Sequence, residues 1–471
     1  MAENDQIATL SPEDPTPNSV MDEETRLRPE FVDKVLDAVD AGDDETARQL
    51  VRPLHPADVA DLIELAASDE REGLVKALAG IVSPDVLAEM NDYVREGLLD
   101  ELEPQQVADI AGQLDTDDAV ALIEDLSRDE QQAVLRAMEP DDRAAVEEAL
   151  SYPEESAGRL MQRDLCAVPD HWNVGQVIDY LRSTKDLPTD FWEVFVVTAD
   201  HHPVGTCKLS TILRTPRTRQ VSDIMQREQT LISVDMDQED VALRFQKYAL
   251  VSAAVVDEDG RLVGMITVDD IVHIIQEEAG EDVLRLSQAG DSDINAPLIE
   301  TVRTRMWWLF INLGTAILAA AVVAAFQGTI TRLVTLAVIM PIVTGMGGNA
   351  ATQTMAVTVR ALATNQLTSS NTWRMIGREW WIASANGLGL GLLMAAGCQL
   401  IYHDLGLSVV LFLAMLLNSL NAGLSGVLIP VGLEKLRIDP AVTSTVFVTT
   451  MTDTFGFFFF LGLAALFGLH S

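Results

Sequence analysis

Residues 446–460 read VFVTTMTDTFGFFFF, and Asp453 is the one carboxylate in the apolar run from Val442 to Leu469. A charged side chain at the centre of a membrane-spanning helix costs roughly 2.5–3.5 kcal/mol on insertion scales, so it normally faces a helix bundle or a water-filled path. We therefore predict that this segment spans a membrane and that Asp453 faces a cation. The simpler alternative is a protonated Asp453 that hydrogen-bonds a neighbouring helix.

The charge of the chain is unevenly distributed. The 471 residues include 72 acidic and 32 basic side chains, for a formal net charge of −40. Residues 301–471 contain eight basic and five acidic side chains, so the first 300 residues carry −43. A soluble region this acidic repels nucleic acid and attracts cations. We expect no nucleic-acid partner.

Five apolar segments after Arg305 are long enough to cross a bilayer. Seven of the eight basic residues in this half flank the same side of the predicted spans, and only Arg332 flanks the other. This positive-inside bias predicts that the acidic region lies in the cytoplasm and the C-terminus outside. The predicted spans are about 306–326, 333–359, 380–402, 405–433 and 441–469.

Small and polar residues interrupt the predicted spans. The second span contains PIVTGMGGNAATQT, from Pro341 to Thr354, and the fourth contains NSLNAGLSGVLIP, from Asn418 to Pro430. Glycines in a span allow close helix packing or expose carbonyls along a cavity. An amide, a carboxylate and backbone oxygens together form a hard-oxygen site, which suits a hydrated ion such as Mg²⁺. For any single glycine, helix packing is the simpler explanation.

The soluble half contains two kinds of repeat. Residues 28–155 show short amphipathic helical segments opened by prolines and acidic first turns, which predicts an all-α superhelical domain. Residues 1–27 are acidic and Pro-rich, and we expect a disordered tail. Farther along, RLMQRDLCAV at 159–168 answers DIMQREQTLI at 223–232, and each copy continues as helix, two strands and helix.

This duplication resembles a tandem of CBS domains, at 156–219 and 220–276. The resemblance implies binding of an adenine nucleotide such as ATP, with Thr267 and Asp270 holding ribose and phosphate. In the first copy the corresponding residues are Lys208 and Thr211, so we expect the second copy to carry the nucleotide site.

The chain as a whole resembles the MgtE-type magnesium transporters. The resemblance rests on PIVTGMGGNAATQ, on LIPVGLEKLRIDPAV at 428–442 and on TTMTDTFG at 449–456. It implies a multidomain membrane protein of the plasma (bacterial inner) membrane: the helical N domain, the α/β CBS pair, a linking plug helix at 277–303 and a five-helix transmembrane domain at 304–471. It also implies a homodimer whose ion path binds Mg²⁺ between the two membrane halves, lined by Asp453, Asn349, Gly348, Gly347 and Thr449.

The same resemblance implies regulatory Mg²⁺ bound among the soluble domains. His273 stands where some members of the family have another acid, and the sequence does not identify the acids of the N domain that complete these sites, because that region is acidic throughout. The positions that match the family are Asp237, Glu239, Asp270, Glu278, Glu281 and Asp282.

Our functional hypothesis is a Mg²⁺-selective channel or transporter that cytosolic Mg²⁺ closes by negative feedback. One alternative is a transporter of another divalent cation, such as Co²⁺ or Mn²⁺, or a proton-coupled exporter. Another is a membrane-anchored metal or nucleotide sensor without transport, against which an intramembrane carboxylate argues. We expect no enzymatic activity, because no nucleophile–base pair, phosphate loop or metal-ligand helix is evident.

Overall fold

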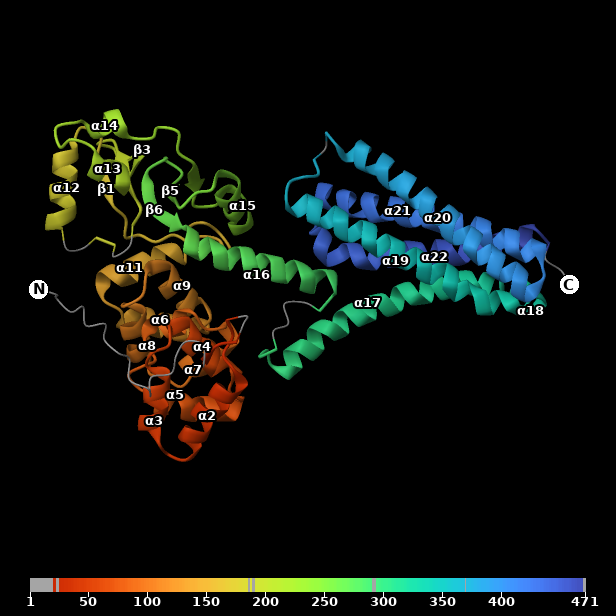
Figure 1. The fold of residues 1–471 in the computed structure, drawn as a ribbon, viewed down its shortest axis with the longest axis horizontal. Coiled ribbons are helices and arrows are strands. Elements are labelled where there is room, and N and C mark those ends of the chain that lie inside the picture. The colour runs from red at the N-terminus through yellow and green to blue at the C-terminus, as the bar shows by residue number, and fades with distance from the viewer. Residues whose placement is uncertain are drawn as a thin grey trace, which may run out of the picture. The chain divides into compact units, whose positions relative to one another are not determined.

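The computed structural model describes residues 20–22, 25–184, 187–188, 191–289, 294–368 and 370–468. The chain divides into two compact units, residues 1–275 and 276–471 (Figure 1). The first contains a helical domain and two small α/β domains, and the second contains five helices long and apolar enough to cross a membrane. The predicted fold class is confirmed.

The N-terminal domain is a stack of short helices around a continuous apolar core. Prolines at the first turns and acidic first-turn residues begin many of these helices, as the sequence predicts. Leu62, Ile63, Leu122 and Ile123 are fully buried. The helices are α2 (Pro29–Asp40), α3 (Asp44–Val51), α4 (Pro56–Leu65), α5 (Ser68–Ala77), α6 (Pro84–Ala88), α7 (Asp92–Leu99), α8 (Pro104–Ala111), α9 (Thr116–Glu124), α10 (Arg128–Ala137) and α11 (Pro140–Ala149).

The predicted tail at 1–27 falls largely outside the described residues, since nothing before residue 20 is described. Val20 and Leu27 are buried in the core of the helical domain. This part of the predicted tail therefore packs with the domain.

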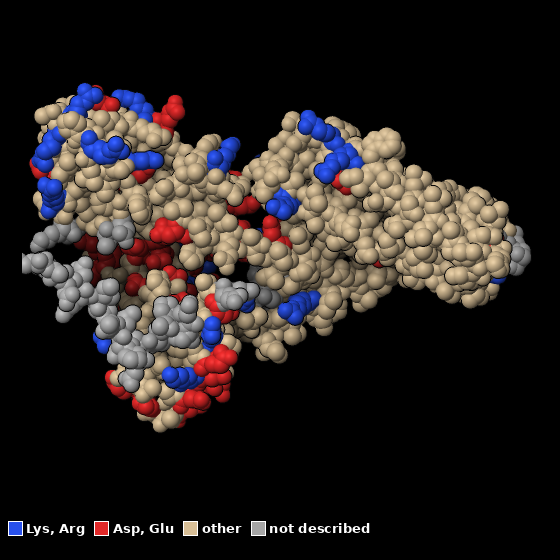
Figure 2. Space-filling view, viewed as in Figure 1, with Lys and Arg blue, Asp and Glu red and all other residues tan. Residues whose placement is uncertain are grey.

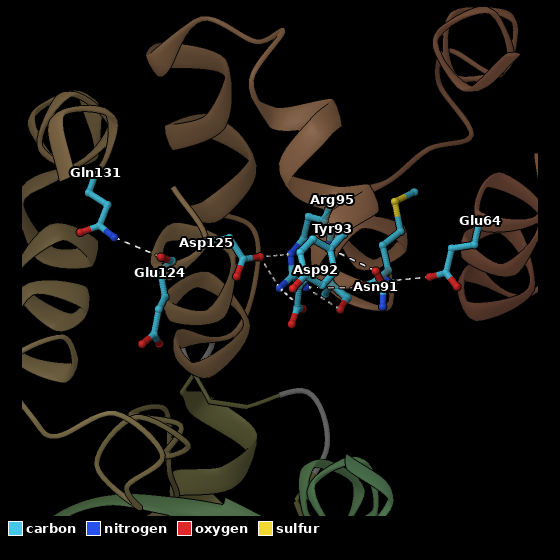
Figure 3. A network of polar contacts seen from close by, with 10 residues as sticks. Glu64, Asn91, Asp92, Tyr93, Arg95, Glu124, Asp125 and Gln131 are labelled. Carbon is cyan, nitrogen blue, oxygen red and sulfur yellow. Dashed lines mark hydrogen bonds and ion pairs between the residues drawn. The ribbon is translucent and has the colours of Figure 1, made fainter. Parts of the chain in front are cut away.

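One buried cation organises the middle of the helical domain. Arg95 on α7 is 4 % exposed, and its Nη2 lies 2.6 Å from Asp125 Oδ2 and 2.7 Å from Asp92 Oδ1 (Figure 3). Burial nevertheless raises the pKa of Asp125 to about 6, against the lowering effect of Arg95. Because Asp125 follows directly on α9, this ion pair fixes the end of the helix whose first turn carries Asp117 and Asp118.

Each α/β domain contains a three-stranded sheet of the same topology, with strand order β1-β2-β3 in the first and β4-β5-β6 in the second. In both, the first pair is parallel and the second antiparallel, with a register irregularity at the same place in the middle strand. The elements are β1 (Ala167–Pro169), α12 (Val174–Ser183), β2 (Glu193–Val197), β3 (Pro203–Lys208), α13 (Leu209–Arg214), α14 (Val221–Ile224), β4 (Leu231–Ser233), α15 (Gln238–Tyr248), β5 (Ser252–Val256) and β6 (Leu262–Thr267).

The two copies pack against each other through the repeated Met-Gln segment. A Cβ at Gly264 of the second copy would lie 2.7 Å from the sulfur of Met161 in the first. Reciprocally, a Cβ at Gly205 would lie 2.8 Å from the carbonyl oxygen of Gln226. Each glycine thus leaves room for a segment of the other copy, which explains why both glycines and both Met-Gln pairs recur together.

The linking helix differs from the predicted range of 277–303. α16 (Val268–Leu286) begins directly after β6 and ends at Leu286. The helix ends where Gln288 adopts a positive φ of 60° and the Ala289 amide donates to the Leu284 carbonyl.

The membrane unit is built around α21, which packs against α19, α20 and α22 and has the most buried residues of the five spans. α20 begins eight residues before the predicted start of the third span, at Thr372. The helices are α17 (Leu298–Ala325), the short α18 (Gln327–Arg332), α19 (Thr335–Ala363), α20 (Thr372–Tyr402), α21 (Leu405–Lys435) and α22 (Pro440–Leu466).

Candidate cation sites

Asp453 lies near the middle of α22 with its side chain half-buried. Within the described ranges, the structure shows no hydrogen bond or ion pair between its carboxylate and another group. Thr449, one turn earlier on the same face, is exposed, whereas Thr452 is fully buried. A partly accessible carboxylate without a partner inside a membrane span is suited to bind a cation.

The predicted residues of the second span divide by exposure along α19. Gly347 is buried, whereas Asn349 is exposed, as are Gly345 and Thr352 one turn before and after it. A face of small and polar residues is poorly suited to lipid and is typical of helix contacts and ion paths. Among the described residues no hydrogen bond joins Asn349 to another group, so its amide remains available.

Asn418 on α21 joins the two motif-bearing helices. Its Nδ2 donates to the Val343 carbonyl of α19 at 2.9 Å, and the residue is 1 % exposed. A Cβ at Gly347 would lie 2.0 Å from this nitrogen, and one at Gly456 of α22 would lie 2.9 Å from it. The two glycines therefore make room for one amide between the helices. The sequence showed Asn418 as a polar residue in a span but did not indicate this role.

A second buried carboxylate of the membrane unit, Glu379, was missed by the sequence analysis. It lies just before the predicted third span but well inside α20, and it is 6 % exposed. The Thr354 hydroxyl of α19 donates to its Oε2 at 3.2 Å. Its place one turn before Ala383, which begins the buried positions of α20, was a signal that could have identified it.

The soluble unit brings together carboxylates from the helical domain and the second CBS copy. The Gln162 side chain lies 3.5 Å from Asp117 Oδ2 and 3.4 Å from Asp270 Oδ2. The Thr267 hydroxyl donates to the same Asp270 oxygen at 2.6 Å. Among the described residues, Asp117 Oδ1 is buried without a hydrogen-bond partner. We call Asp115, Asp117, Asp118 and Asp270 the acidic cluster.

The carboxylates of the acidic cluster have raised pKa values. Burial, reinforced by Asp270, Asp118 and Asp115, raises the pKa of Asp117 well above its usual range. Burial and Asp270 raise the pKa of Asp118 to about 6, and burial together with neighbouring carboxylates raises that of Asp270 to about 6. Among the described residues no three acidic, His or Cys side chains already converge as metal ligands. The cluster is therefore a concentration of negative charge that only a proton or a cation can relieve.

The other predicted regulatory residues occupy two separate places. Asp237 caps α15 by accepting the Glu239 amide at 2.9 Å, and Glu239 is exposed on the same turn. Among the described residues, the structure shows no contact between Asp237 and the acidic cluster. Glu278, Glu281 and Asp282 lie in the second half of α16.

The end of α16 is attached to the beginning of α22 within the second unit. Arg285 lies 2.5 Å from Glu281 and 3.6 Å from Asp439, the residue that caps α22. The Thr445 hydroxyl donates to the Leu286 carbonyl at 2.9 Å. Burial and Asp439 raise the pKa of Asp282. The helix that carries Asp453 is thus in direct contact with the linking helix.

The predicted nucleotide residues do not line the cavity between the two CBS copies. A cavity of about 560 Å³ lies between the two CBS copies, and its lining includes Lys208, Gln229 and Tyr248 but neither Thr267 nor Asp270. Gln229 Oε1 is buried and has no hydrogen-bond partner among the described residues. Lys208 is the residue that replaces the expected threonine in the first copy. The cavity is therefore lined by both copies and includes the first-copy position where the sequence lacks the expected threonine.

A carboxylate in a membrane span, in a chain that also contains an acidic soluble region with two CBS copies, is typical of membrane transporters of divalent cations. The family model described as "Divalent cation transporter" matches residues 340–463. Two further family models, "MgtE intracellular N domain" and "CBS domain", match residues 54–155 and 221–277. The chain belongs to the MgtE family. It is a multi-pass membrane protein whose N-terminal domains are cytosolic.

Curated relatives agree with this assignment. The magnesium transporter MgtE of Enterococcus faecalis is 30% identical over 314 residues, covering 67% of this chain and 69% of the relative. That of Thermus thermophilus is 31% identical over 317 residues, covering 66% and 70%. A solved structure, the cytosolic domain of the Mg²⁺ channel MgtE in complex with ATP, is 26% identical with a TM-score of 0.48 and covers 52% of this chain and 99% of that one.

Proposed function

We propose that this protein is a Mg²⁺-selective channel or transporter of the plasma membrane, with Asp453 as the residue that holds the ion. The observation that carries the proposal is the half-buried carboxylate of Asp453, which has no partner within the described residues of its span. Mg²⁺ dehydrates reluctantly and binds through one or two carboxylates, so one Asp and neighbouring oxygens match its chemistry. Asn349, Gly347, Gly348 and Thr449 complete the proposed path.

The test is Mg²⁺ uptake into proteoliposomes by wild type and Asp453→Asn. The matched control is Asp404→Asn, since Asp404 caps α21 through the Leu407 amide and Asn is an equally good cap. We expect uptake to be lost only in the first variant. Equal uptake by both variants would remove Asp453 as the ion site. Uptake of Co²⁺ or Mn²⁺ in preference to Mg²⁺ would assign a different cargo.

The path is completed by a second copy of the chain in this proposal. The exposed Gly345, Asn349 and Thr352 of α19 and the exposed Thr449 of α22 are polar positions that a single copy leaves open. Burying them against lipid would cost free energy, whereas a twofold partner would place two such faces opposite each other. Cysteine cross-linking at Thr352 in membranes should trap a covalent dimer, and a control cysteine at Leu392 on the lipid-exposed side of α20 should not.

Cytosolic Mg²⁺ closes the path by binding the acidic cluster, according to the same proposal. The orphaned oxygen of Asp117 and the raised pKa values of Asp118 and Asp270 support this assignment, because a divalent cation would offset the repulsion within the cluster. One residue of the cluster, Asp270, lies in the first turn of α16, and the other end of this helix contacts α22, so α16 connects the two places along the chain. A tenfold preference of one ion for the closed state contributes about 1.4 kcal/mol.

Neutralising the cluster tests this regulation. In Asp117→Asn/Asp118→Asn, uptake should persist at cytosolic Mg²⁺ concentrations that inhibit the wild type. The control Asp33→Asn/Asp37→Asn removes the same charge from exposed positions of α2 and should leave inhibition unchanged. The predicted set Asp237, Glu239, Glu278, Glu281 and Asp282 is tested in the same way. Unaltered inhibition in the first variant would sink the proposal for the cluster.

An adenine nucleotide such as ATP is the proposed ligand of the cavity between the CBS copies. The cavity volume is in the usual range for such ligands. The orphaned Gln229 oxygen fits an adenine amino group, and Lys208 fits a phosphate. The Thr267 hydroxyl donates to Asp270, which belongs to the acidic cluster, so this proposal assigns the pair to the cluster and not to the nucleotide. Calorimetric titration with ATP distinguishes the cavity from the Thr267 motif as the nucleotide site. Lys208→Ala should weaken ATP binding, whereas Thr267→Ala should not.

The orientation of the membrane domain follows from the number of spans. With cytosolic N-terminal domains and five spans, the C-terminus is on the outside. A protease site added at the C-terminus should be cut only from the outer face of intact cells.

A further inference from the structure

Two arginines near the beginning of α20 lie on the face of that helix that is exposed to lipid. Arg374 and Arg378 are one turn apart, and Trp381, Leu388 and Leu392 continue the same line at helical spacing. All three are exposed, at 70%, 45% and 61%. The opposite face packs inward through Ala383, Gly387, Gly391 and Cys398, which are buried.

The length of α20 fixes the depth of these residues. Trp381 and Tyr402 are 21 residues apart, which corresponds to about 31 Å of helix and therefore to the thickness of a hydrocarbon core. Aromatic residues at both ends of such a stretch mark the two membrane interfaces. Arg378 and Arg374 then lie about 4 and 10 Å beyond the acyl chains, which is the depth of the phospholipid headgroups.

The two guanidinium groups have no acceptor in the chain as far as it is described. No hydrogen bond or ion pair to Arg374 or Arg378 side-chain atoms occurs among those residues. The acid adjacent in sequence, Glu379, is turned inward to Thr354. Figure 2 shows basic side chains gathered at this end of the membrane unit, whereas its remaining visible surface is largely uncharged.

We propose that Arg374, Arg378 and Trp381 form a binding site for the headgroup of an anionic phospholipid in the cytoplasmic leaflet. Paired arginines bind phosphate oxygens through several charge-assisted hydrogen bonds. Trp381, which meets Trp380 edge-to-face with ring centroids 5.1 Å apart, lies at the junction of headgroup and chains. Leu388 and Leu392 contact the acyl chains below. A lipid satisfies the charged and apolar parts together, which a soluble anion does not.

The site is tested with the full-length protein in phosphatidylcholine vesicles that contain brominated phosphatidylglycerol or, separately, brominated phosphatidylcholine. Bromine quenches tryptophan fluorescence on contact, and the difference between wild type and Trp381→Phe isolates the signal of Trp381. We expect brominated phosphatidylglycerol to quench this signal at a lower membrane fraction than brominated phosphatidylcholine. In Arg374→Gln/Arg378→Gln this preference for phosphatidylglycerol should fall by about tenfold. That value lies between the losses expected for the removal of one and of two interfacial basic residues.

The control Arg303→Gln/Arg305→Gln removes the same charge from α17, where a spacing of two residues points the side chains apart. It should keep the preference. Three results would overturn the proposal: equal quenching by the two lipids in wild type, an equal loss in the control, or loss of the preference on addition of inorganic phosphate, which would indicate a free-anion site. Dissociation of the dimer by Arg374→Gln/Arg378→Gln would assign the face to a second copy instead.

Discussion

Gly347→Ala should destabilise the membrane unit, although alanine is the better helix former. The added methyl group would lie 2.0 Å from Asn418 Nδ2 and 2.8 Å from its Cγ. Asn418 is 1 % exposed and has no space to retreat without breaking its 2.9 Å hydrogen bond to the Val343 carbonyl. Overpacking costs about 1–3 kcal/mol, and leaving the buried amide unpaired costs about 1–3 kcal/mol more. The helix propensity of alanine returns about 1 kcal/mol, so the net loss is about 1–5 kcal/mol.

The measurement is the unfolding free energy in detergent, with Gly389→Ala as the matched control. Gly389 lies inside α20, and a Cβ there would have no atom within 4 Å, so this variant should be neutral or slightly stabilised. A double-mutant cycle with Asn418→Ala adds a second criterion, because truncating Asn418 removes the atoms that clash. The double variant should be more stable than the sum of the single losses predicts, by about 1–3 kcal/mol. Equal stability of the two alanine variants, or strict additivity in the cycle, would refute the reasoning.

Three further predictions concern stability, docking and the buried glutamate. The folded-state pKa of Asp118 is about 6, above its unfolded value. Without Mg²⁺ the protein should therefore become less stable as the pH rises from 4 to 6. Asp118→Asn should reduce this loss of stability in thermal unfolding. Arg285→Gln removes the 3.6 Å contact with Asp439; it should change stability by at most about 1 kcal/mol, because the pair is partly exposed, yet raise Mg²⁺ uptake at inhibitory Mg²⁺. Glu379→Gln keeps an acceptor for Thr354, whereas Glu379→Leu does not, so only the leucine variant should lose about 1–3 kcal/mol of unfolding free energy; matching values would contradict the buried bond.

The membrane spans could be predicted because a hydrocarbon core imposes a length and a composition on any helix that crosses it. The third helix begins earlier than the predicted span for a physical reason. Arg374, Arg378 and Glu379 lower the hydropathy of the first two turns of α20, yet the helix continues through them. The arginines point outward, and the glutamate forms an internal hydrogen bond. A hydropathy profile counts three charged residues but contains no information on the directions of their side chains.

The acidic cluster could be predicted only in part. Asp270 was identified through the resemblance to the family, but its neighbours Asp117 and Asp118 are more than 150 residues earlier in a domain that is acidic throughout. What selects them is a tertiary contact, the Gln162 side chain between Asp117 and Asp270. The nucleotide site at Thr267 and Asp270 stays a prediction. In the structure the Thr267 hydroxyl donates to Asp270, whose Oδ2 also lies 3.4 Å from the Gln162 side chain.

The geometry of the proposed ion path depends on a helix that contributes none of the predicted ligands. Asn418 of α21 donates to α19, and Asn421 donates to the Met451 carbonyl of α22 at 3.3 Å. Amide-to-carbonyl bonds between helices hold a fixed register, which apolar contacts in a membrane do not specify as strictly. α21 therefore fixes how far α19 and α22 are shifted along each other, and with this the relative depth of Asn349 and Asp453 in the membrane. Because a misplacement of about 1 Å weakens ion coordination strongly, substitutions at Asn418 and Asn421 should alter ion selectivity before they abolish uptake.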